Sequence, residues 1–451
     1  MGCRVCAPDG LAVRERAPHG NVLAYPKAMV CPTRRDFVRL LGVGACASPL
    51  LELGCGDNLG SNERDAAAAV LEPTTDRLIV AVWARTARTA TIEIRDGDLV
   101  TTVPIELDRS GSAAIDLEDL RPATRYAISI DVAGLRLGPY AGRTAPRDDD
   151  PRPVRIAVFA DVDPNPEFET DLVAHVVAAE PDLLVSLGDF PYTDNGPVAQ
   201  TLAAYRDRHA EIRSLPSIRA LLEAAPLRAI YDDHEFRNNW DAGFAAAETD
   251  RYAAAMTTWD EFFPVRDATG ERRFRNWRWG ANVECFLLDC RRFRSANAAV
   301  DDAHKTMLGE TQLAWLLDAI ARSTAAFKLV LTSVPLGFGT GDDHWSSFAT
   351  ERDAMLDALV GIRGVVFVAA DQHLFAAHRH AHGIREFQVG PLARGIAKPG
   401  ALEPGVLFRA ERYNVGLFDV SADRVVVTGL GPGGERFYEE TLGMDDLTPT
   451  P

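Results

Sequence analysis

The sequence is poor in positive charge. Among 451 residues, 48 are lysine or arginine and 65 are aspartate or glutamate, so the formal net charge is −17 at pH 7. A protein that holds nucleic acid through its phosphates needs a basic face, which this balance does not supply. We therefore expect no nucleic-acid partner, and any bound phosphate group must be neutralised locally, by metal ions or a few arginines.

Cysteine is scarce beyond the N-terminal segment, and long hydrophobic runs are missing. Five of the seven cysteines lie at or before Cys55, which leaves Cys285 and Cys290. These two are five residues apart in VECFLLDC, which would put them on opposite faces of one strand, so we expect no disulfide between them. The apolar run near the N-terminus is too short to predict a membrane span.

Residues 1–57 predict an export leader. The stretch TRRDFVRLLGVGACA places paired arginines and an aromatic residue before a short apolar run, which resembles a twin-arginine signal. We therefore expect the twin-arginine export machinery as a partner and a periplasmic or extracellular location. A lipid anchor on Cys55 or Cys46 and ordinary cleavage at an A-x-A sequence are both open, and translation is expected to begin at Met29.

Residues 66–146 predict a small all-β domain. Stretches such as TATIEIRD and RYAISIDV alternate apolar with polar residues and are separated by Gly, Asp and Pro turns. The stretch LRPATRYAISI resembles the entry into a strand of a fibronectin-like sandwich. The charged, proline-rich linker APRDDDPRP ends this domain, in which nothing has a catalytic pattern.

Residues 153–440 show strands in alternation with helices. Short apolar runs rich in Val, Ile and Leu are separated in several places by helical patterns such as TDLVAHVVAAE. Continuous apolar strands belong to a sheet covered on both faces, so we expect an α/β domain. The apolar runs are residues 154–161, 181–189, 227–233, 284–290, 327–333 and 364–373.

Acidic and histidine side chains follow these apolar runs. In open α/β sheets, ligands bind outside the carboxyl ends of the strands, so these side chains can converge on one site. Without a cation, so many carboxylates would repel one another, which favours a metal cluster over a set of separate turn residues. The residues concerned are Asp161, Asp189, Asp232, Asp233, His234, Asp289, Ser333, Asp371 and His373.

Five motifs follow in order along the chain: SLGDFPYTDN, YDDHEFRNNW, LLDCRRFRS, HWSSFATERDAML and ADQHLFAAHRH. Together they resemble the motifs of the PhoD-like alkaline phosphatases, a branch of the calcineurin-like metallophosphoesterases. The resemblance runs from about Ala66 to the C-terminus. It implies a metallophosphoesterase β-sandwich flanked by helices, preceded by the fibronectin-like domain.

The resemblance also implies the metal ligands. Asp189 in GDFPY would bridge two metals, and Tyr192 would bind ferric iron. Asp163 and Asp371 stand where the wider superfamily has histidines, so the site is rich in oxygen. Hard oxygen ligands favour Ca²⁺, Mg²⁺, Mn²⁺ or Fe³⁺ over Zn²⁺, and the resemblance implies Fe³⁺ with Ca²⁺, with Mn²⁺ and Mg²⁺ as alternatives. The expected ligands are Asp161, Asp163, Asp189, Tyr192, Asp232, Asp233, Asp371 and His373.

The implied function is hydrolysis of phosphomonoesters by attack of a metal-generated hydroxide on phosphorus. His234 and Arg291 are the expected catalytic residues, with Arg237 and Asn238 as substrate-binding residues. A phosphodiesterase with phospholipase D-like activity at the same metals is one alternative. A metal- or phosphate-binding surface protein without catalysis is another.

Two further motifs lie outside the expected ligand set. PLGFGTGDDHW lacks the lysine and Ser/Thr of a phosphate-cradling loop, and we expect it to place Asp342, Asp343 and His344 near the substrate. In AAHRHAHG, His378, His380 and His382 could bind metal, but we favour a surface histidine run.

Overall fold

The computed structural model describes most of the chain beyond residue 63. It describes two short strands near the N-terminus and residues 64–163, 165–266, 273–337, 343–398 and 400–451. The expected twin-arginine signal, the candidate anchors Cys46 and Cys55, Met29 and Asp342 lie outside the described residues. Within the described part, no helix is both long enough and apolar enough to cross a membrane.

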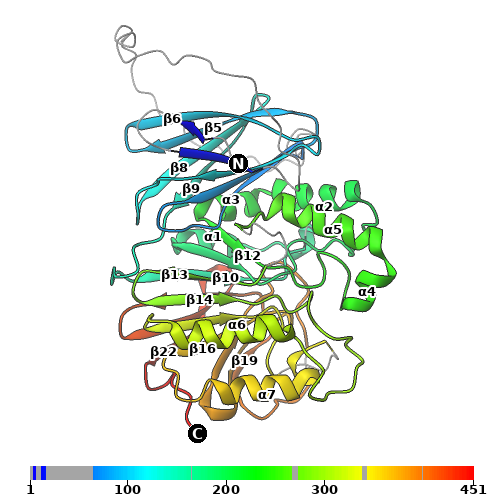
Figure 1. Ribbon diagram of the computed structural model, residues 1–451, viewed down its shortest axis with the longest axis vertical. Helices are drawn as coiled ribbons and strands as arrows, with labels where there is room; N and C mark the ends of the chain where they lie inside the picture. Colours follow the sequence, from blue (N-terminus) through cyan, green and yellow to red (C-terminus); the bar gives the residue numbers. More distant parts are fainter. Residues whose placement is uncertain are drawn as a thin grey trace.

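Strands β3 to β9 form an all-β region, blue to cyan in Figure 1. Their bounds are Ala66–Leu71, Leu78–Ala84, Thr89–Asp96, Leu99–Glu106, Ser112–Leu117, Arg125–Val132 and Leu135–Arg143. Strands β6, β5, β8 and β9 make a four-stranded sheet, whereas β7, β4 and β3 belong to an 11-stranded sheet that also contains β1 (Arg4–Cys6) and β2 (Ala12–Arg16). On β6, buried Val103 and Ile105 alternate with exposed Thr102 and Pro104, as in a half-buried strand.

This all-β region shares a sheet with the α/β part of the chain. Strand β3 pairs in parallel with β12 (Leu227–Ala229), with Leu71 opposite Leu227. The backbone N–H of Glu72 also donates to the carbonyl of Leu227 at 3.1 Å. The pattern of residues 66–146 predicts a separate sandwich, and the pairing of β3 with β12 is the feature that it does not predict. The likeness to a fibronectin-like domain stays a prediction.

Two sheets form the α/β part. The 11-stranded sheet continues in the order β12-β11-β10-β20-β21-β22, and a seven-stranded sheet has the order β13-β14-β15-β16-β18-β17-β19. A buried hydrophobic core joins Val158 and Val185 of the first sheet to Leu329 and Phe387 of the second. The bounds of β10, β11 and β13 to β22 are Val154–Phe159, Leu183–Ser186, Arg275–Trp279, Val283–Leu287, Phe327–Leu331, Val365–Ala369, Phe375–Arg379, Arg385–Gln388, Val406–Ala410, Val415–Val420, Arg424–Leu430 and Arg436–Gly443.

Helices flank the sheets of this mixed α/β fold on two sides. Helices α1 to α3 and α5 lie between the all-β region and the sheets, and α6 and α7 lie on the far side (Figure 1). Leu316 and Ile320 of α6 pack against Phe286 and Val330 of the seven-stranded sheet. Helices α1 to α7 span Leu172–Ala178, Leu202–Ser214, Pro216–Ala224, Ala242–Ala247, Thr249–Phe262, Gly309–Arg322 and Ala349–Ala358. Short 3₁₀ helices η1 to η4 span Pro166–Phe168, Trp345–Phe348, Ala381–Gly383 and Pro432–Gly434.

The two sheets bring their strand ends to a common edge. Strands β10, β11 and β12 run parallel in one sheet, as do β14, β15 and β16 in the other, and each lies within a predicted apolar run. Side chains that follow the two sets touch, because Asp232 after β12 accepts hydrogen bonds from Arg291 after β14 and Ser333 after β15. The convergence expected from the strand-end rule is therefore present.

Candidate metal centre

Asp161 and Asp189 follow β10 and β11 on sharply turned backbone. Their φ angles are 59° and 55°, in the left-handed region that residues other than glycine adopt rarely. The turns are fixed by backbone bonds, because Asp161 donates to Gly188 and Val162 donates to Asp189 at 2.8 Å. Such backbone strain at a strand end is common at functional sites.

Asp161 is buried without a hydrogen-bond partner. Its side chain is 1% exposed, and neither carboxylate oxygen has a partner among the described residues. A Cβ added to Gly390 would lie 2.2 Å from Oδ2 of Asp161, so only glycine fits behind the carboxylate. A buried, unpaired carboxylate is costly unless a cation compensates it, and this is the observation that fits a metal most directly.

His373 and Tyr192 complete a first group of donors with Asp161 and Asp189. Nδ1 of His373 donates to the carbonyl of Gly395 at 2.7 Å, which leaves Nε2 to accept from the Tyr192 hydroxyl at 2.8 Å. Ligand atoms of Asp161, Asp189 and His373 lie within 4.8 Å of one another. Burial and the Asp189 and Asp161 carboxylates raise the pKa of Tyr192 well above its usual range, so only a bound cation would ionise its hydroxyl.

Asp233 and His234 form a second group with Asp189. Oδ2 of Asp233 accepts from the backbone of Asn239 at 2.6 Å, while Oδ1 has no hydrogen-bond partner in the described part of the chain. Nε2 of His234 lies 3.9 Å from that oxygen. Ligand atoms of Asp189, Asp233 and His234 also lie within 4.8 Å, so Asp189 is common to both groups, as expected for a bridging ligand.

The His234 imidazole is held on two sides. Its Nδ1 lies 2.7 Å from Oδ1 of Asp194, and its ring lies over Tyr192 with centroids 4.1 Å apart. Burial lowers the pKa of His234, but Asp233 and Asp194 outweigh burial and raise it to about 9. The protonated imidazole can donate from Nε2 while Asp194 holds Nδ1.

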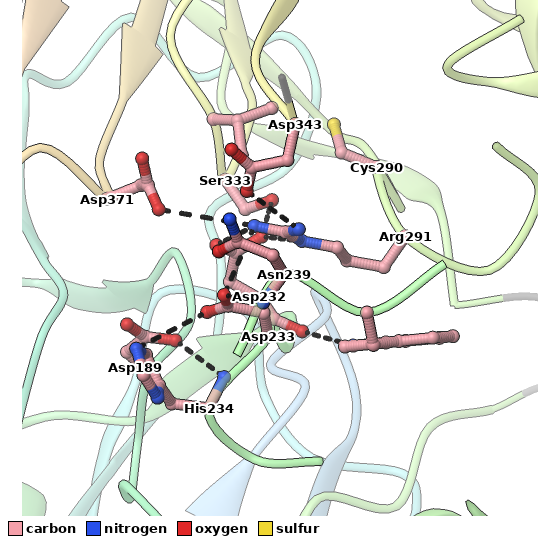
Figure 2. Close-up of polar contacts among 12 residues, drawn as sticks. Asp189, Asp232, Asp233, His234, Asn239, Cys290, Arg291, Ser333, Asp343 and Asp371 are labelled. Carbon is pink, nitrogen blue, oxygen red and sulfur yellow. Dashed lines mark hydrogen bonds and ion pairs between the residues drawn. The ribbon is translucent and has the colours of Figure 1, made fainter. Parts of the chain in front are cut away.

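Arg291 forms a buried ion-pair cluster with carboxylates of the centre. Its side chain has no exposed surface, and its Nε and Nη2 donate to both oxygens of Asp232 at 2.7 Å. Nη1 donates to Asp343 at 3.0 Å, and Ser333 donates to Asp232 at 2.6 Å. Figure 2 shows this arrangement, with Arg291 directed at the carboxylates. The structure thus surrounds the guanidinium with carboxylates, and the expected catalytic role of Arg291 stays a prediction.

Asp371 joins the centre from β16, also on left-handed backbone, with a φ of 73°. Its Oδ2 lies 2.9 Å from Nε2 of His344 and accepts from Gln372 at 2.7 Å. Ligand atoms of Asp343, His344 and Asp371 lie within 4.8 Å, as do those of Asp232, Asp233 and Asp371. His344, expected near the substrate, thus lies against an expected metal ligand.

Without a cation, the candidate metal centre cannot keep all of its buried carboxylates ionised. Burial, followed by the charges of neighbouring carboxylates, raises the pKa of Asp161 and of Asp189 well above the usual range. Burial raises the pKa of Asp232 to about 6, despite Arg291. Hard cations among these oxygens would relieve the repulsion. The donor set therefore fits such cations.

Three acidic residues at strand ends have other partners. Asp163 accepts from the backbone of Asn165 at 2.8 Å and from the side chain of Asn195, and it joins none of the ligand groups of the described residues. Asp289 accepts from the Tyr231 hydroxyl and from the backbone of Arg291. Glu235 accepts from the backbone of Phe190 and Asp232. Asp289 and Glu235 thus hold the loops that carry expected ligands, and the expected ligand role of Asp163 stays a prediction.

The expected substrate residues Arg237 and Asn238 lie on the surface. The Arg237 side chain is 48% exposed and pairs with Glu248 at 3.1 Å. Asn238 is exposed, and its backbone donates to Oδ2 of Asp194 at 2.8 Å. The structure thus gives Arg237 an acidic partner away from the ligand groups and gives Asn238 a place beside Asp194.

Asp194 is the residue of the centre that the strand-end pattern misses. It lies five residues after Asp189, in a loop, within the motif SLGDFPYTDN. Its only signal in the sequence is that it shares this motif, because its partner His234 lies 40 residues away.

The fold and part of the sequence match known phosphatases. A family model described as PhoD-like phosphatase matches residues 166–413. Alkaline phosphatase D of Bacillus subtilis (strain 168) is 26% identical over an alignment of 246 residues, and the match covers 44% of this chain and 42% of that relative. The chain thus matches less than half the length of this curated relative.

Two solved structures share the fold. One, described as the structure of PhoD, has a TM-score of 0.73 and 18% identity, over 84% of this chain and 88% of that chain. A purple acid phosphatase from yellow lupin (Lupinus luteus) seeds has a TM-score of 0.63 and 11% identity, over 84% and 75%.

Proposed function

The chain belongs to the PhoD-like phosphatase family, and from this premise we propose that it is an exported, metal-dependent hydrolase of phosphomonoesters. The observation that carries the metal dependence is the pair of buried oxygens of Asp161, neither of which has a hydrogen-bond partner in the part of the chain that the structure describes. An unpaired carboxylate in this position destabilises a metal-free protein, so its presence is understandable if it binds a cation.

The proposed ligands divide by donor chemistry. Asp161, Asp189, Tyr192 and His373 would hold Fe³⁺, because a phenolate and carboxylates suit a hard trivalent ion. Asp232, Asp233 and Asp371, whose ligand atoms lie within 4.8 Å, would hold Ca²⁺ together with the shared Asp189, with Mn²⁺ or Mg²⁺ as alternatives. Cations bound there would supply charge neutralisation for the phosphoryl oxygens and a water of lowered pKa.

His234 is the proposed proton donor. Asp194 accepts from Nδ1, and the carbonyl of His234 accepts from the backbone and hydroxyl of Thr193 at 2.8 and 2.9 Å. These bonds fix the ring, so Nε2 can donate its proton to a phosphoryl oxygen or to the leaving alkoxide. A positioned acid of this kind contributes roughly 10²- to 10⁴-fold to the rate.

Export is proposed from the twin-arginine resemblance of the leader. An exported phosphatase would release phosphate from esters that do not enter the cell. N-terminal sequencing of the protein from culture medium and from the periplasm tests this part. Cys46→Ser and Cys55→Ser, followed by membrane fractionation, test the lipid anchor. A full-length precursor confined to the cytoplasm would contradict export.

The hydrolysis test compares p-nitrophenyl phosphate with bis(p-nitrophenyl) phosphate on one sample whose iron and calcium are measured. We expect faster turnover of the monoester, loss of turnover on chelation, and recovery when iron and calcium are returned. Faster turnover of the diester would show that the preferred substrates are phosphodiesters rather than phosphomonoesters. Turnover of neither ester with the metals bound would favour the non-catalytic alternative.

A further inference from the structure

A second group of metal-ligand side chains lies outside the candidate metal centre. His378 on β17, His380 just after that strand and Glu386 on β18 place ligand atoms within 4.8 Å of one another. The group shares no residue with the ligand groups at the strand ends. The surface histidine run favoured from the sequence is wrong for His378, which is 2% exposed.

The sheet itself assembles this group. Strands β17 and β18 are antiparallel, with His378 directly opposite Glu386. His380 follows His378 by two residues, and residues two apart project to the same side of an extended chain. The two imidazole rings are stacked, with centroids 5.7 Å apart and planes 13° apart. The three donors therefore point into one space without any rearrangement of the backbone.

Glu386 is a buried carboxylate that has no lysine or arginine as an ion-pair partner among the described residues. Its side chain has no exposed surface, and among the described residues its ion-pair partner is His380, 2.7 Å away, with no lysine or arginine within 4 Å. Its other oxygen accepts from the backbone of Leu336 at 2.8 Å. A buried carboxylate next to imidazoles, without a permanent cation, suits a metal ion.

The donor types also favour a metal. Two imidazoles with one carboxylate form a set that binds Zn²⁺ with an open fourth position.

We propose that His378, His380 and Glu386 bind one transition-metal ion, Zn²⁺, at a site separate from the candidate metal centre. Imidazole ligands select Zn²⁺ over Ca²⁺, whereas the strand ends supply hard oxygen ligands. The two sites therefore take different metals. This inference does not depend on the proposed function.

The zinc site would fix the segment that follows β15. Glu386 binds the backbone of Leu336, and a Cβ added to Gly337 would lie 3.0 Å from Cε1 of His380. The same segment carries Ser333, which donates to Asp232 in the candidate metal centre. Zinc would thus stabilise one wall of that centre without contacting substrate.

The test measures zinc in untagged protein that already holds iron and calcium. Wild type, His380→Gln, Glu386→Gln and the control His382→Gln are incubated with Zn²⁺, freed of unbound metal and analysed by mass spectrometry. The control lies in the same histidine run but pairs with Asp357 at 2.7 Å. We expect one more zinc equivalent in wild type and His382→Gln than in the other two, and a zinc-dependent rise in melting temperature only in the first pair.

Equal zinc content in all four proteins would overturn the proposal. A Co²⁺ titration of wild type, with iron and calcium bound, needs no variant and covers the case of a variant that does not fold. The proposal predicts visible d–d bands that Zn²⁺ removes, and their absence contradicts it. Ester hydrolysis by His380→Gln, measured in parallel, keeps this outcome separate from that of the proposed function.

Discussion

The carboxylate of Asp194 contacts both the imidazole of His234 and the backbone of the loop that follows His234. Its Oδ1 lies 2.7 Å from Nδ1 of His234, and its Oδ2 accepts from the backbone of Asn238 at 2.8 Å. The carboxylate therefore orients the imidazole and stabilises its protonated form, in which Nε2 carries the outward proton.

We predict that Asp194→Asn lowers kcat with little change in metal content. An asparagine can no longer stabilise the protonated ring, so we expect about 10- to 100-fold lower kcat, within the range that acid catalysis supplies. His234→Ala should lose about 10²- to 10⁴-fold, and the double variant should lose no more than His234→Ala. Additive losses, from steady-state kinetics and metal analysis, would show that Asp194 acts independently of His234.

Tyr192→Phe tests the identity of the first metal. A phenolate bound to Fe³⁺ absorbs visible light, so the wild type should be coloured and the variant colourless. Tyr205→Phe is the control, because its hydroxyl binds the carbonyl of Phe236 and the side chain of Arg251. The spectrum is recorded on protein of known iron content. An active wild type that is colourless and free of iron would contradict the iron assignment.

Arg291→Lys distinguishes a structural from a substrate-binding arginine. The lysine keeps the charge but lacks the planar guanidinium that binds both oxygens of Asp232 and also Asp343, and the loss of this buried geometry costs up to about 3–5 kcal/mol. We expect a loss of this order in the free energy of unfolding, measured in urea. Arg292→Lys, at a partly exposed neighbour, should change stability little. Unchanged stability together with weaker inhibition by inorganic phosphate would instead show that Arg291 binds the substrate.

Glu72 forms buried ion pairs that link the all-β region to the α/β part of the chain, and we predict that acid weakens this link. It pairs with Arg228 and Arg275, and these outweigh burial and lower its pKa. Because glutamate has a pKa of about 4.3 in an unfolded chain, the stabilisation is complete above about pH 4.3 and is lost as pH falls through the folded value.

Glu72→Gln should therefore cost about 3–5 kcal/mol at pH 7 and flatten the fall in stability below pH 4.3. Glu93→Gln, which removes surface pairs with Arg95 and Arg136, should cost less than about 1 kcal/mol. Urea unfolding between pH 3 and pH 7 measures both variants. A Glu72→Gln curve parallel to that of wild type would contradict the link.

The strand-end pattern predicts the meeting of Asp161, Asp189, Asp233 and Asp371 because parallel strands end at one edge of a sheet. It does not predict that Leu71 pairs with Leu227, since a pairing across so many residues leaves no local pattern. The six predicted apolar runs contain strands because each run is mainly apolar, as a sheet covered on both faces requires.

The strand-end pattern does not predict which partner each side chain binds. An arginine after a strand can bind phosphate or a carboxylate, and Arg291 binds Asp232 only because the two sheets bring these residues together. Asp163 has the same chemistry as Asp161, yet its loop gives it Asn165 and Asn195 as partners. A carboxylate that binds metal and one that holds a loop can occupy similar positions after a strand. The sequence alone therefore does not tell them apart, whereas their hydrogen-bond partners in the structure do.

The melting temperature of Asp161→Asn, compared with wild type, tests the central claim that the strand ends hold cations. In chelator the variant should melt higher, because the buried charge of Asp161 is gone. With iron and calcium it should melt lower, because a ligand is lost. Asp163→Asn, whose oxygens are already hydrogen-bonded, should melt lower in both conditions. A difference of the same sign in both conditions for Asp161→Asn would contradict the claim.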